Sequence, residues 1–207
     1  REFYINDRGN QMDYFGQSVE AVALGNPVPE NGYQGDYIKD LAADVVAQNA
    51  GIKDLPADER LIAFREAAYQ LQLKDQQRVL DTFNTHFDVW FSERSLHDQG
   101  AVEHGMEKLR AQGHVFEVDG AVWLRTTDFG DDKDRVMRKS DGSFTYFVPD
   151  VAYHTSKWNR GFHKVINVQG SDHHGTIARV RSGLQGVAQK RGWDIPKTYP
   201  DYVLHKM

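Results

Sequence analysis

The stretch VINVQGSDHHGTI, residues 165–177, joins a strand pattern to a helix pattern through a short polar turn. Its apolar run ends at Gly170, and the polar run SDHH follows before Gly175. Apolar residues then recur at helical spacing at positions 177, 180, 184 and 187, as far as Gly192. The sequence therefore predicts a buried strand that passes through a tight turn directly into a helix.

The neighbouring segments extend this pattern in both directions. Phe144–Val148 has the composition of a strand, residues 151–160 suit a helix that ends at Gly161, and Tyr202–Leu204 reads as a further strand. Strand-helix-strand-helix-strand at this spacing implies a parallel sheet with right-handed crossovers. Ligands of such sheets bind beyond the carboxyl ends of the strands. We expect Asp7, Asp150 and the Gly170–Gly175 turn at such ends.

The first part of the chain has a mixed pattern. Apolar periodicity predicts three helices in its first 85 residues and a fourth that Gly113 ends, and two strands are expected as well. Asp-Gly pairs between alternating runs indicate hairpins. The helices are expected at 10–24, between Asp36 and Gly51, at 57–85 and at 99–112, the strands at Phe3–Ile5 and 87–93, and the hairpins at 115–126 and 136–148.

Composition limits the classes of protein to consider. The chain has 207 residues, 40% of them hydrophobic, which suffices for one large domain or two small ones. It has no cysteine, so disulfides and thiolate metal sites are excluded, and a reducing, cytoplasmic location is expected. The net charge of −5 gives no basic footprint of nucleic-acid binding, and no apolar run is long enough to span a bilayer.

The SDHH turn admits three interpretations. Asp172, His173 and His174 could bind zinc or iron, but adjacent histidines point in different directions and rarely share one ion. Ser171 or Asp172 could instead cap the helix that follows. A nucleotide or substrate site explains the two close glycines as well, because glycine lets a ligand approach the backbone closely. From the residues alone we favour the third interpretation.

Asp150 follows Pro149 and precedes a predicted helix, so its simplest role is that of an N-cap. The functional alternative places Asp150 in a cleft beside Tyr146, where a carboxylate and a phenol would suit a cationic or guanidinium ligand. The acidic run 128–135 is expected to be a solvated loop. The histidines at 86, 97, 104 and 114 are expected to be surface or packing residues.

Several stretches taken together resemble one family. REFYINDRGNQ, GYQGDYI, FDVWFSERSL, LRTTDFGDDKDRVMRKSDGSFTYFVPDVAYH and GFHKVINVQGSDHHG are similar to segments of bacterial arginyl-tRNA synthetase. They occur in that family's order and cover essentially the whole chain. Each stretch alone is weakly specific, whereas the ordered set is specific.

The resemblance implies a class I aminoacyl-tRNA synthetase, which activates arginine with ATP and esterifies the 3′-terminal adenosine of tRNA. The expected fold is α/β, a partial Rossmann-type parallel sheet interrupted by a mostly helical connective insertion with β-hairpins. Residues 1–10 and 128–207 would belong to the catalytic domain and residues 11–127 to the insertion. The family's HIGH and KMSKS-like motifs do not occur, so we expect a central fragment that is inactive alone.

The resemblance also assigns site residues by position. Tyr146, Asp150 and His173 match the arginine pocket, and Gly170 and Asp172 match the turn that meets the ribose of ATP. No residue is assigned a catalytic role and no tightly bound metal is expected, since Mg²⁺ would arrive with ATP. The implied partners are arginine, ATP and tRNA(Arg), in a full-length enzyme that is monomeric and binds no membrane.

Two other functions remain open from the sequence. One is a non-catalytic module that binds arginine or a nucleotide, or that mediates an interaction, with the pocket retained and the chemistry lost. The other is a metal-dependent hydrolase that uses Asp172, His173 and His174 as ligands. The flanking sequence of the intact gene product would separate the enzyme from the module, and metal analysis would test the hydrolase.

Overall fold

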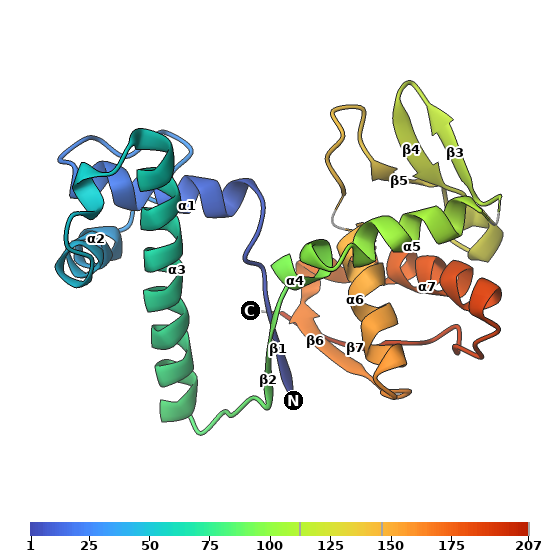
Figure 1. Cartoon of the computed structure of the whole chain (residues 1–207). Coiled ribbons are helices and arrows are strands. Elements are labelled where there is room, and N and C mark those ends of the chain that lie inside the picture. Colours follow the sequence, from blue (N-terminus) through green and yellow to red (C-terminus); the bar gives the residue numbers. More distant parts are fainter. Residues whose placement is uncertain (112, 146, 207) are drawn as a thin grey trace. The chain divides into compact units, whose positions relative to one another are not determined.

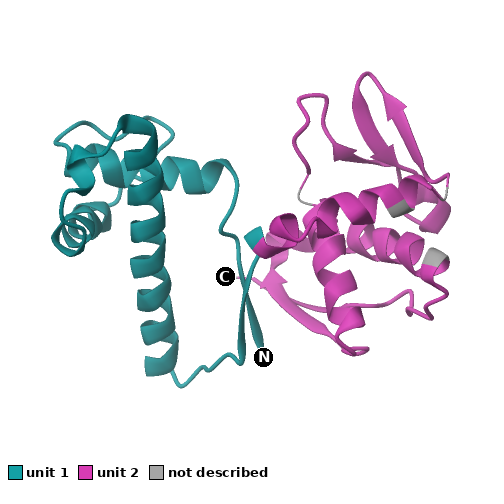
Figure 2. Cartoon of the chain, viewed as in Figure 1, with its two compact units in different colours: residues 1–94 teal, residues 95–207 magenta. Residues whose placement is uncertain are grey.

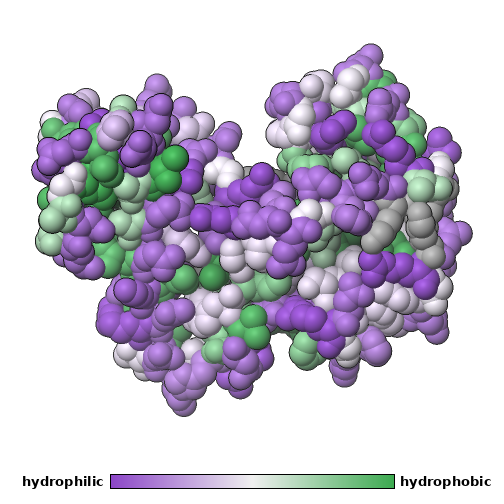
Figure 3. All heavy atoms as spheres, viewed as in Figure 1, coloured by the Kyte–Doolittle hydropathy of each residue, from purple (hydrophilic) through white to green (hydrophobic). Residues whose placement is uncertain are grey.

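The computed structural model describes residues 1–111, 113–145 and 147–206. The chain divides into two compact units, Arg1–Arg94 and Ser95–Met207, which Figure 2 shows in different colours. Most side chains on the face seen in Figure 3 are hydrophilic, in keeping with a mean hydropathy of −0.64. Among the described residues, no helix combines the length and the apolar character that crossing a membrane requires.

Unit 1 consists of a strand pair and a group of helices. The helices α1, α2 and α3 pack around one apolar core, and α1 crosses α3 (Figure 1). The predicted apolar stripe of α3 is confirmed at its centre, because Phe64 and Ala68 are fully buried. The elements of unit 1 are β1 (Glu2–Ile5), α1 (Asn10–Ala23), α2 (Tyr37–Gln48), the 3-10 helix η1 (Ile52–Asp54), α3 (Ala57–Thr82) and β2 (Val89–Ser92).

The two strands of unit 1 are parallel, with Glu2 opposite Val89 and Ile5 opposite Ser92. Parallel neighbours cannot be joined by a tight turn, so the chain needs a long crossover, and here α1, α2 and α3 supply it. The predicted boundaries of the catalytic domain and the insertion stay a proposal. The pairing joins β1, which lies in the predicted catalytic domain, to β2, which lies in the predicted insertion.

Unit 2 contains two small sheets and the helices that accompany them (Figure 1). Strands β3, β4 and β5 form an antiparallel sheet, while β6 and β7 are parallel and connected through α7. The elements are α4 (Arg94–Asp98), α5 (Ala101–Arg110), β3 (Val115–Val118), β4 (Ala121–Leu124), the 3-10 helix η2 (Thr126–Phe129), β5 (Arg135–Arg138), α6 (Phe147–Asn159), β6 (Ile166–Gly170), the 3-10 helix η3 (Ser171–Thr176), α7 (Ile177–Arg191) and β7 (Asp201–His205).

The predicted α/β fold with parallel strands is confirmed in its main features. The β3–β4 hairpin turns at Asp119 and Gly120, whose φ angles of 50° and 75° are those of the expected tight turn. The strand β6 leads through a short turn into α7, which ends at Gly192 in the left-handed conformation (φ 63°). The second predicted hairpin is shorter than expected, since Phe144 makes only an isolated bridge to Arg138.

The predicted strand Phe144–Val148 is wrong, because α6 already begins at Phe147. Phe147, Val148 and Val151 are all buried, a spacing that one face of a helix produces. Pro149 does not end a strand but lies in the first turn of α6. A proline is tolerated there because its missing N–H would have no partner within the helix.

The acidic loop at 128–135 is only partly solvated, contrary to the prediction. The side chain of Asp131 is 1% exposed and accepts from Nε and Nη2 of Arg135, both at 2.9 Å. This pairing holds the pKa of Asp131 far below its usual range. The Thr126 hydroxyl donates to the carbonyl of Lys133 at 2.7 Å, so the loop is fastened at both ends.

Asp7 is the polar centre of unit 1. It is 3% exposed, and its Oδ2 accepts from the hydroxyls of Ser92 at 2.6 Å and Tyr69 at 3.0 Å. Its Oδ1 accepts from the backbone N–H of Arg94 at 3.0 Å. Burial and the charge of Asp7 raise the pKa of Tyr69 to about 12. One carboxylate therefore links the end of β1, the end of β2 and the middle of α3.

We expect Asp7→Ala to lower the free energy of unfolding of unit 1 by about 3 kcal/mol, because three part-buried donors would lose their acceptor. Urea denaturation followed by circular dichroism measures this change. Asp13→Ala is the matched control, since Asp13 pairs with Arg65 at 2.8 Å but is half exposed, and it should cost less than about 1 kcal/mol. Equal losses in the two variants would contradict the central role of Asp7.

Candidate functional site

The turn after β6 brings together three of the predicted site residues. Gly170 ends β6, and Asp172 and His173 lie on η3, the 3-10 helix that leads to α7. A Cβ atom at position 170 would meet only the exposed carboxylate of Asp172, so glycine gives this side chain room to fold back over the turn. His173 Nε2 lies 3.6 Å from Asp172 Oδ2. The predicted turn is therefore present as a short helix at the carboxyl end of β6.

The side chains of this turn face solvent. Asp172 and His173 are 82% and 56% exposed, and Gly170 lies opposite His205 at the end of β7. The capping interpretation is wrong, because Thr176 occupies the N-cap position of α7 and no side chain caps that helix. Exposed polar side chains at the carboxyl ends of parallel strands are placed to meet a ligand that comes from solvent.

The metal interpretation gains no support from the geometry. Across residues 1–111, 113–145 and 147–206, no three His, Asp or Glu side chains converge closely enough to share an ion. The absence of a tightly bound metal stays a prediction, and elemental analysis of the purified protein would test it.

Asp150 lies in the first turn of α6, three residues after the helix begins. It is therefore neither an N-cap nor a residue that follows a strand, as the sequence had suggested. A carboxylate in the first turn is stabilised by the helix dipole. Tyr146, the predicted companion of Asp150, lies outside the described residues.

Asp150 is half-buried, and its charge acts on Tyr202 of β7. Burial is the main cause that raises the pKa of Tyr202 to about 12, and the nearby charge of Asp150 adds to it. Asp150 and the phenol of Tyr202 therefore share one electrostatic environment, although they come from a helix and a strand. The helix α6, which carries Asp150, lies on this face of the sheet, because its His154 contacts Asn167, the residue opposite Tyr202.

A buried polar cluster between α6 and the sheet was missed from the sequence. His154 is 3% exposed, and its Nε2 lies 2.9 Å from Nδ2 of Asn167 on β6. Lys157 is 8% exposed and donates to Oδ1 of Asn167 at 3.3 Å, with its Nζ 3.8 Å from the centre of the Tyr153 ring. The available signal was spacing, because His154 lies one helical turn after Asp150 and Lys157 a further turn along.

The strand pattern does not indicate this cluster. Asn167 lies in an otherwise apolar run, which predicts a buried strand and gives no sign that Asn167 is the centre of a polar cluster. In the structure Ile166 and Val168 are 56% and 72% exposed, while Asn167 between them faces the helices. The covered face of β6 carries the polar side chains of Asn167 and Gln169 and its exposed face the apolar Ile166 and Val168, the reverse of the usual arrangement.

His154 is held in its neutral form. Burial, together with the nearby positive charge of Lys157, lowers the pKa of His154 well below its ordinary value of 6.5. In the unfolded chain the same imidazole takes up a proton near pH 6.5. Since the unfolded state then binds more protons, the free energy of unfolding falls as the pH falls below about 6.5.

We expect His154→Gln to flatten the acid side of the stability profile. The wild-type chain should lose at most about 1.4 kcal/mol per pH unit through His154 between roughly pH 6.5 and 5, and the variant should not. Melting temperatures across this range measure the difference. His174→Gln is the control, because His174 is exposed on η3. If both variants follow the wild-type profile, His154 is not the group responsible.

The α/β fold agrees with what comparison with known proteins finds. The family described as tRNA synthetases class I (R), catalytic domain, matches residues 35–191. The chain belongs to this family. Over 212 aligned residues it is 57% identical to an arginine–tRNA ligase of Polynucleobacter necessarius, and over 222 it is 52% identical to one of Ralstonia nicotianae. Each alignment covers all of this chain but 36% of the relative, so the chain spans about a third of these proteins.

Solved structures support the same family. A protein from Campylobacter jejuni whose crystal structure bears the name arginyl-tRNA synthetase is 32% identical, with a TM-score of 0.83. The alignment covers 100% of this chain and 45% of that protein. The arginyl-tRNA synthetase of Thermus thermophilus, at 17% identity and a TM-score of 0.65, shares the fold across 99% of this chain and 41% of its own.

Proposed function

We propose that this chain is the arginine- and ATP-binding part of an arginine–tRNA ligase. The main support is the family match over residues 35–191, together with relatives of that name that align with the whole chain. The site adds a chemical reason. Asp150 supplies a half-buried carboxylate near the sheet, and Asp172 an exposed carboxylate at the carboxyl end of β6.

Asp150 is proposed to bind the guanidinium of arginine, with Tyr146 and His173 as further contacts. A guanidinium is planar, always charged and carries five N–H donors, so a selective pocket has to offer it acceptors. A carboxylate is the strongest acceptor among protein side chains, and it can bind a guanidinium in a bidentate way. The half-buried position of Asp150 strengthens such a pair relative to one in water.

Gly170 and Asp172 are proposed to bind the adenosine of ATP. The close backbone approach that Gly170 permits suits a flat ligand, and the exposed Asp172 carboxylate can accept from ribose hydroxyls. Mg²⁺ would come with the phosphates of ATP rather than occupy a site in this chain. The partners would be arginine, ATP and tRNA(Arg), and the complete ligase a cytoplasmic monomer.

The reaction so proposed has two steps. The arginine carboxylate attacks the α-phosphorus of ATP, which forms arginyl-adenylate and releases pyrophosphate. The adenylate then transfers its arginyl group to the 3′-terminal adenosine of tRNA and releases AMP. This chain would contribute placement of the two substrates, whose proximity and orientation can supply much of the rate. Stabilising the charge that develops on the phosphates would depend on other segments.

Asp150→Asn tests the arginine pocket in the full-length protein that carries this chain. Asparagine keeps the shape of the side chain but removes its charge. Losing a charge-assisted hydrogen bond costs about 2–3 kcal/mol, so kcat/KM for arginine should fall roughly 30- to 150-fold. Arginine-dependent ATP–pyrophosphate exchange with tRNA present measures this change.

Asp172→Ala is the matched variant, and it should raise KM for ATP while it leaves KM for arginine within about twofold. Normal kcat/KM for arginine in Asp150→Asn would show that the pocket has been assigned to the wrong residue. If Asp172→Ala left both kcat and KM for ATP unchanged, the ribose would have to bind elsewhere.

The 207 residues alone are proposed to be inactive, because the sequence contains neither the HIGH nor the KMSKS-like motif. We therefore expect no arginine-dependent ATP–pyrophosphate exchange by this chain above background, even with tRNA present. The alternative is a non-catalytic module that binds arginine or a nucleotide, and the sequence that flanks these residues in the intact gene product would distinguish the two. Turnover by the 207-residue chain would refute the proposed inactivity. Lasting inactivity of the full-length protein would favour the module.

A further inference from the structure

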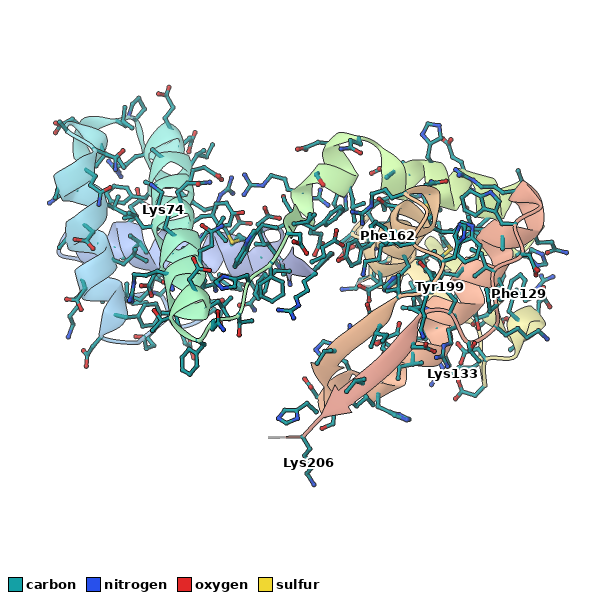
Figure 4. All side chains as sticks on the ribbon, turned by 90° about the horizontal axis from the view of Figure 1, so that it is seen from below. Lys74, Phe129, Lys133, Phe162, Tyr199 and Lys206 are labelled. Atoms are coloured by element: carbon teal, nitrogen blue, oxygen red, sulfur yellow. The ribbon has the colours of Figure 1, made fainter. Side chains whose placement is uncertain are left out.

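The loops at the amino ends of β6 and β7 form a second surface of unit 2, which has no part in the proposed function so far. Residues 160–165 connect α6 to β6, and residues 192–200 connect α7 to β7. The hydroxyl of Tyr199 donates to the carbonyl of Phe162 at 3.1 Å, and both residues are labelled in Figure 4. This hydrogen bond joins the two loops into one surface.

This loop surface lies at the opposite end of the strands from the proposed substrate site. The pairing of Ile166 with Asp201 marks the amino ends of the two strands. The pairing of Gly170 with His205 marks their carboxyl ends, where η3 begins. A strand rises about 3.3 Å per residue, so roughly 13 Å of strand separate the two ends. A molecule bound at the amino ends therefore need not enter the site proposed for arginine and ATP.

Positive charge is concentrated on the loop surface, although the chain as a whole has a net charge of −5. Residues 157–166 include no Asp or Glu, and residues 191–200 include Asp194 as their single acidic residue. Lys164 and Lys197 are exposed, and each lies two residues from the hydrogen bond that joins the loops. Among the side chains that the structure describes, no carboxylate forms an ion pair with either lysine. Both ammonium groups are therefore available to an anionic partner.

Two guanidinium groups lie over aromatic rings of the same surface. The guanidinium carbon of Arg160 is 5.5 Å from the centre of the Phe162 ring, and that of Arg191 is 4.4 Å from the centre of the Trp193 ring. Phe162 is 54% exposed, so much of its ring is accessible to solvent. Proteins bind single-stranded RNA with this combination, because bases stack on aromatic rings while phosphates contact the neighbouring cations.

We propose that the loops 160–165 and 192–200 form an RNA-binding surface. Lys164 and Lys197 contact phosphates of the RNA backbone, and an unpaired base stacks on the ring of Phe162. The inference rests on the proposed function for the identity of the RNA, since tRNA(Arg) is the RNA that this function requires. The whole chain is negatively charged and repels a phosphate backbone, so a local patch of positive charge is where such a backbone can make contact.

The alternative is that another segment of the full-length protein packs on these loops. The two roles predict different losses. An RNA contact makes the affinity for RNA fall with salt, because each neutralised phosphate releases a counterion, and it contributes nothing to the stability of the RNA-free protein. A packing contact contributes to the melting temperature of the RNA-free protein and leaves the affinity for RNA and its salt dependence unchanged.

The double variant Lys164→Gln/Lys197→Gln of the full-length protein tests the phosphate contacts. Fluorescence anisotropy with labelled tRNA(Arg) measures Kd at salt concentrations from about 50 to 200 mM. We expect Kd to rise at least tenfold at about 100 mM salt. The slope of the logarithm of affinity against the logarithm of salt concentration should become less steep by roughly two, about one for each lysine. Kd and slope equal to those of wild type would overturn the proposal, above all if the melting temperature falls instead.

The matched control is Lys53→Gln/Lys74→Gln, which removes the same charge from unit 1 (Lys74 is labelled in Figure 4). Both lysines are exposed, and each is followed directly by an aspartate, so neither is part of a positive patch. We expect this control to leave Kd for tRNA(Arg) within about twofold and the salt slope unchanged. A loss equal to that of the loop variant would show that net charge, rather than the loop surface, determines RNA binding.

Two substitutions of Phe162 test the stacked base. Phe162→Leu keeps an apolar side chain but removes the ring, whereas Phe162→Tyr keeps the ring. We expect the leucine variant to raise Kd for tRNA(Arg) about tenfold with an unchanged salt slope, because a stacking partner is lost and no charge is removed. The tyrosine variant should bind within about twofold of wild type. Equal Kd values for the two variants would contradict stacking on this ring.

Binding and catalysis separate failure of this inference from failure of the proposed function. If the full-length protein shows arginine-dependent ATP–pyrophosphate exchange and Lys164→Gln/Lys197→Gln binds tRNA(Arg) as wild type does, the proposed function stands and the RNA-binding surface is wrong. If exchange is absent but the same variant loses affinity for RNA with the expected change in slope, the surface stands and the proposed function is wrong.

Discussion

Parallel strand pairing is the constraint on which the rest of each unit depends. Two parallel neighbours cannot be joined by a hairpin, so the chain has to leave the sheet and return to its starting edge. In unit 2, α7 makes this return between β6 and β7. The crossover leaves the carboxyl ends of both strands side by side, with Gly170 opposite His205. Asp172 comes two residues after Gly170, so its exposed carboxylate lies just beyond that edge of the sheet.

The same constraint acts in unit 1 with a much longer connection. The helices α1, α2 and α3 fill the crossover between β1 and β2, and they bury a core of their own. A core of this kind does not need the strands, so something else has to connect them to the helices. The carboxylate of Asp7 has this role, since it accepts from both Ser92 at the end of β2 and Tyr69 on α3.

The sequence predicts this architecture well where periodicity is strong and poorly where a polar residue determines the structure. The long helix α3 and the β3–β4 hairpin follow from apolar spacing and from the Asp119-Gly120 pair. The segment Phe144–Val148 misleads, because aromatic and β-branched residues favour strands locally, whereas burial of Phe147, Val148 and Val151 favours a helix. Tertiary packing decides between helix and strand here, and a local sequence pattern does not reveal that packing.

The site shows the same limit. The turn from Gly170 to Asp172 can be predicted, because two close glycines and a strand end are visible in the sequence. The cluster around Asn167 cannot, because its members come from positions 154, 157 and 167, and only the fold brings the helix and the strand together. A buried amide, a buried ammonium and a neutral imidazole also carry a desolvation cost that an apolar core would avoid. Proteins depart from the most stable packing chiefly at functional or strained sites, and the proposed arginine pocket at Asp150 lies one turn of α6 from His154.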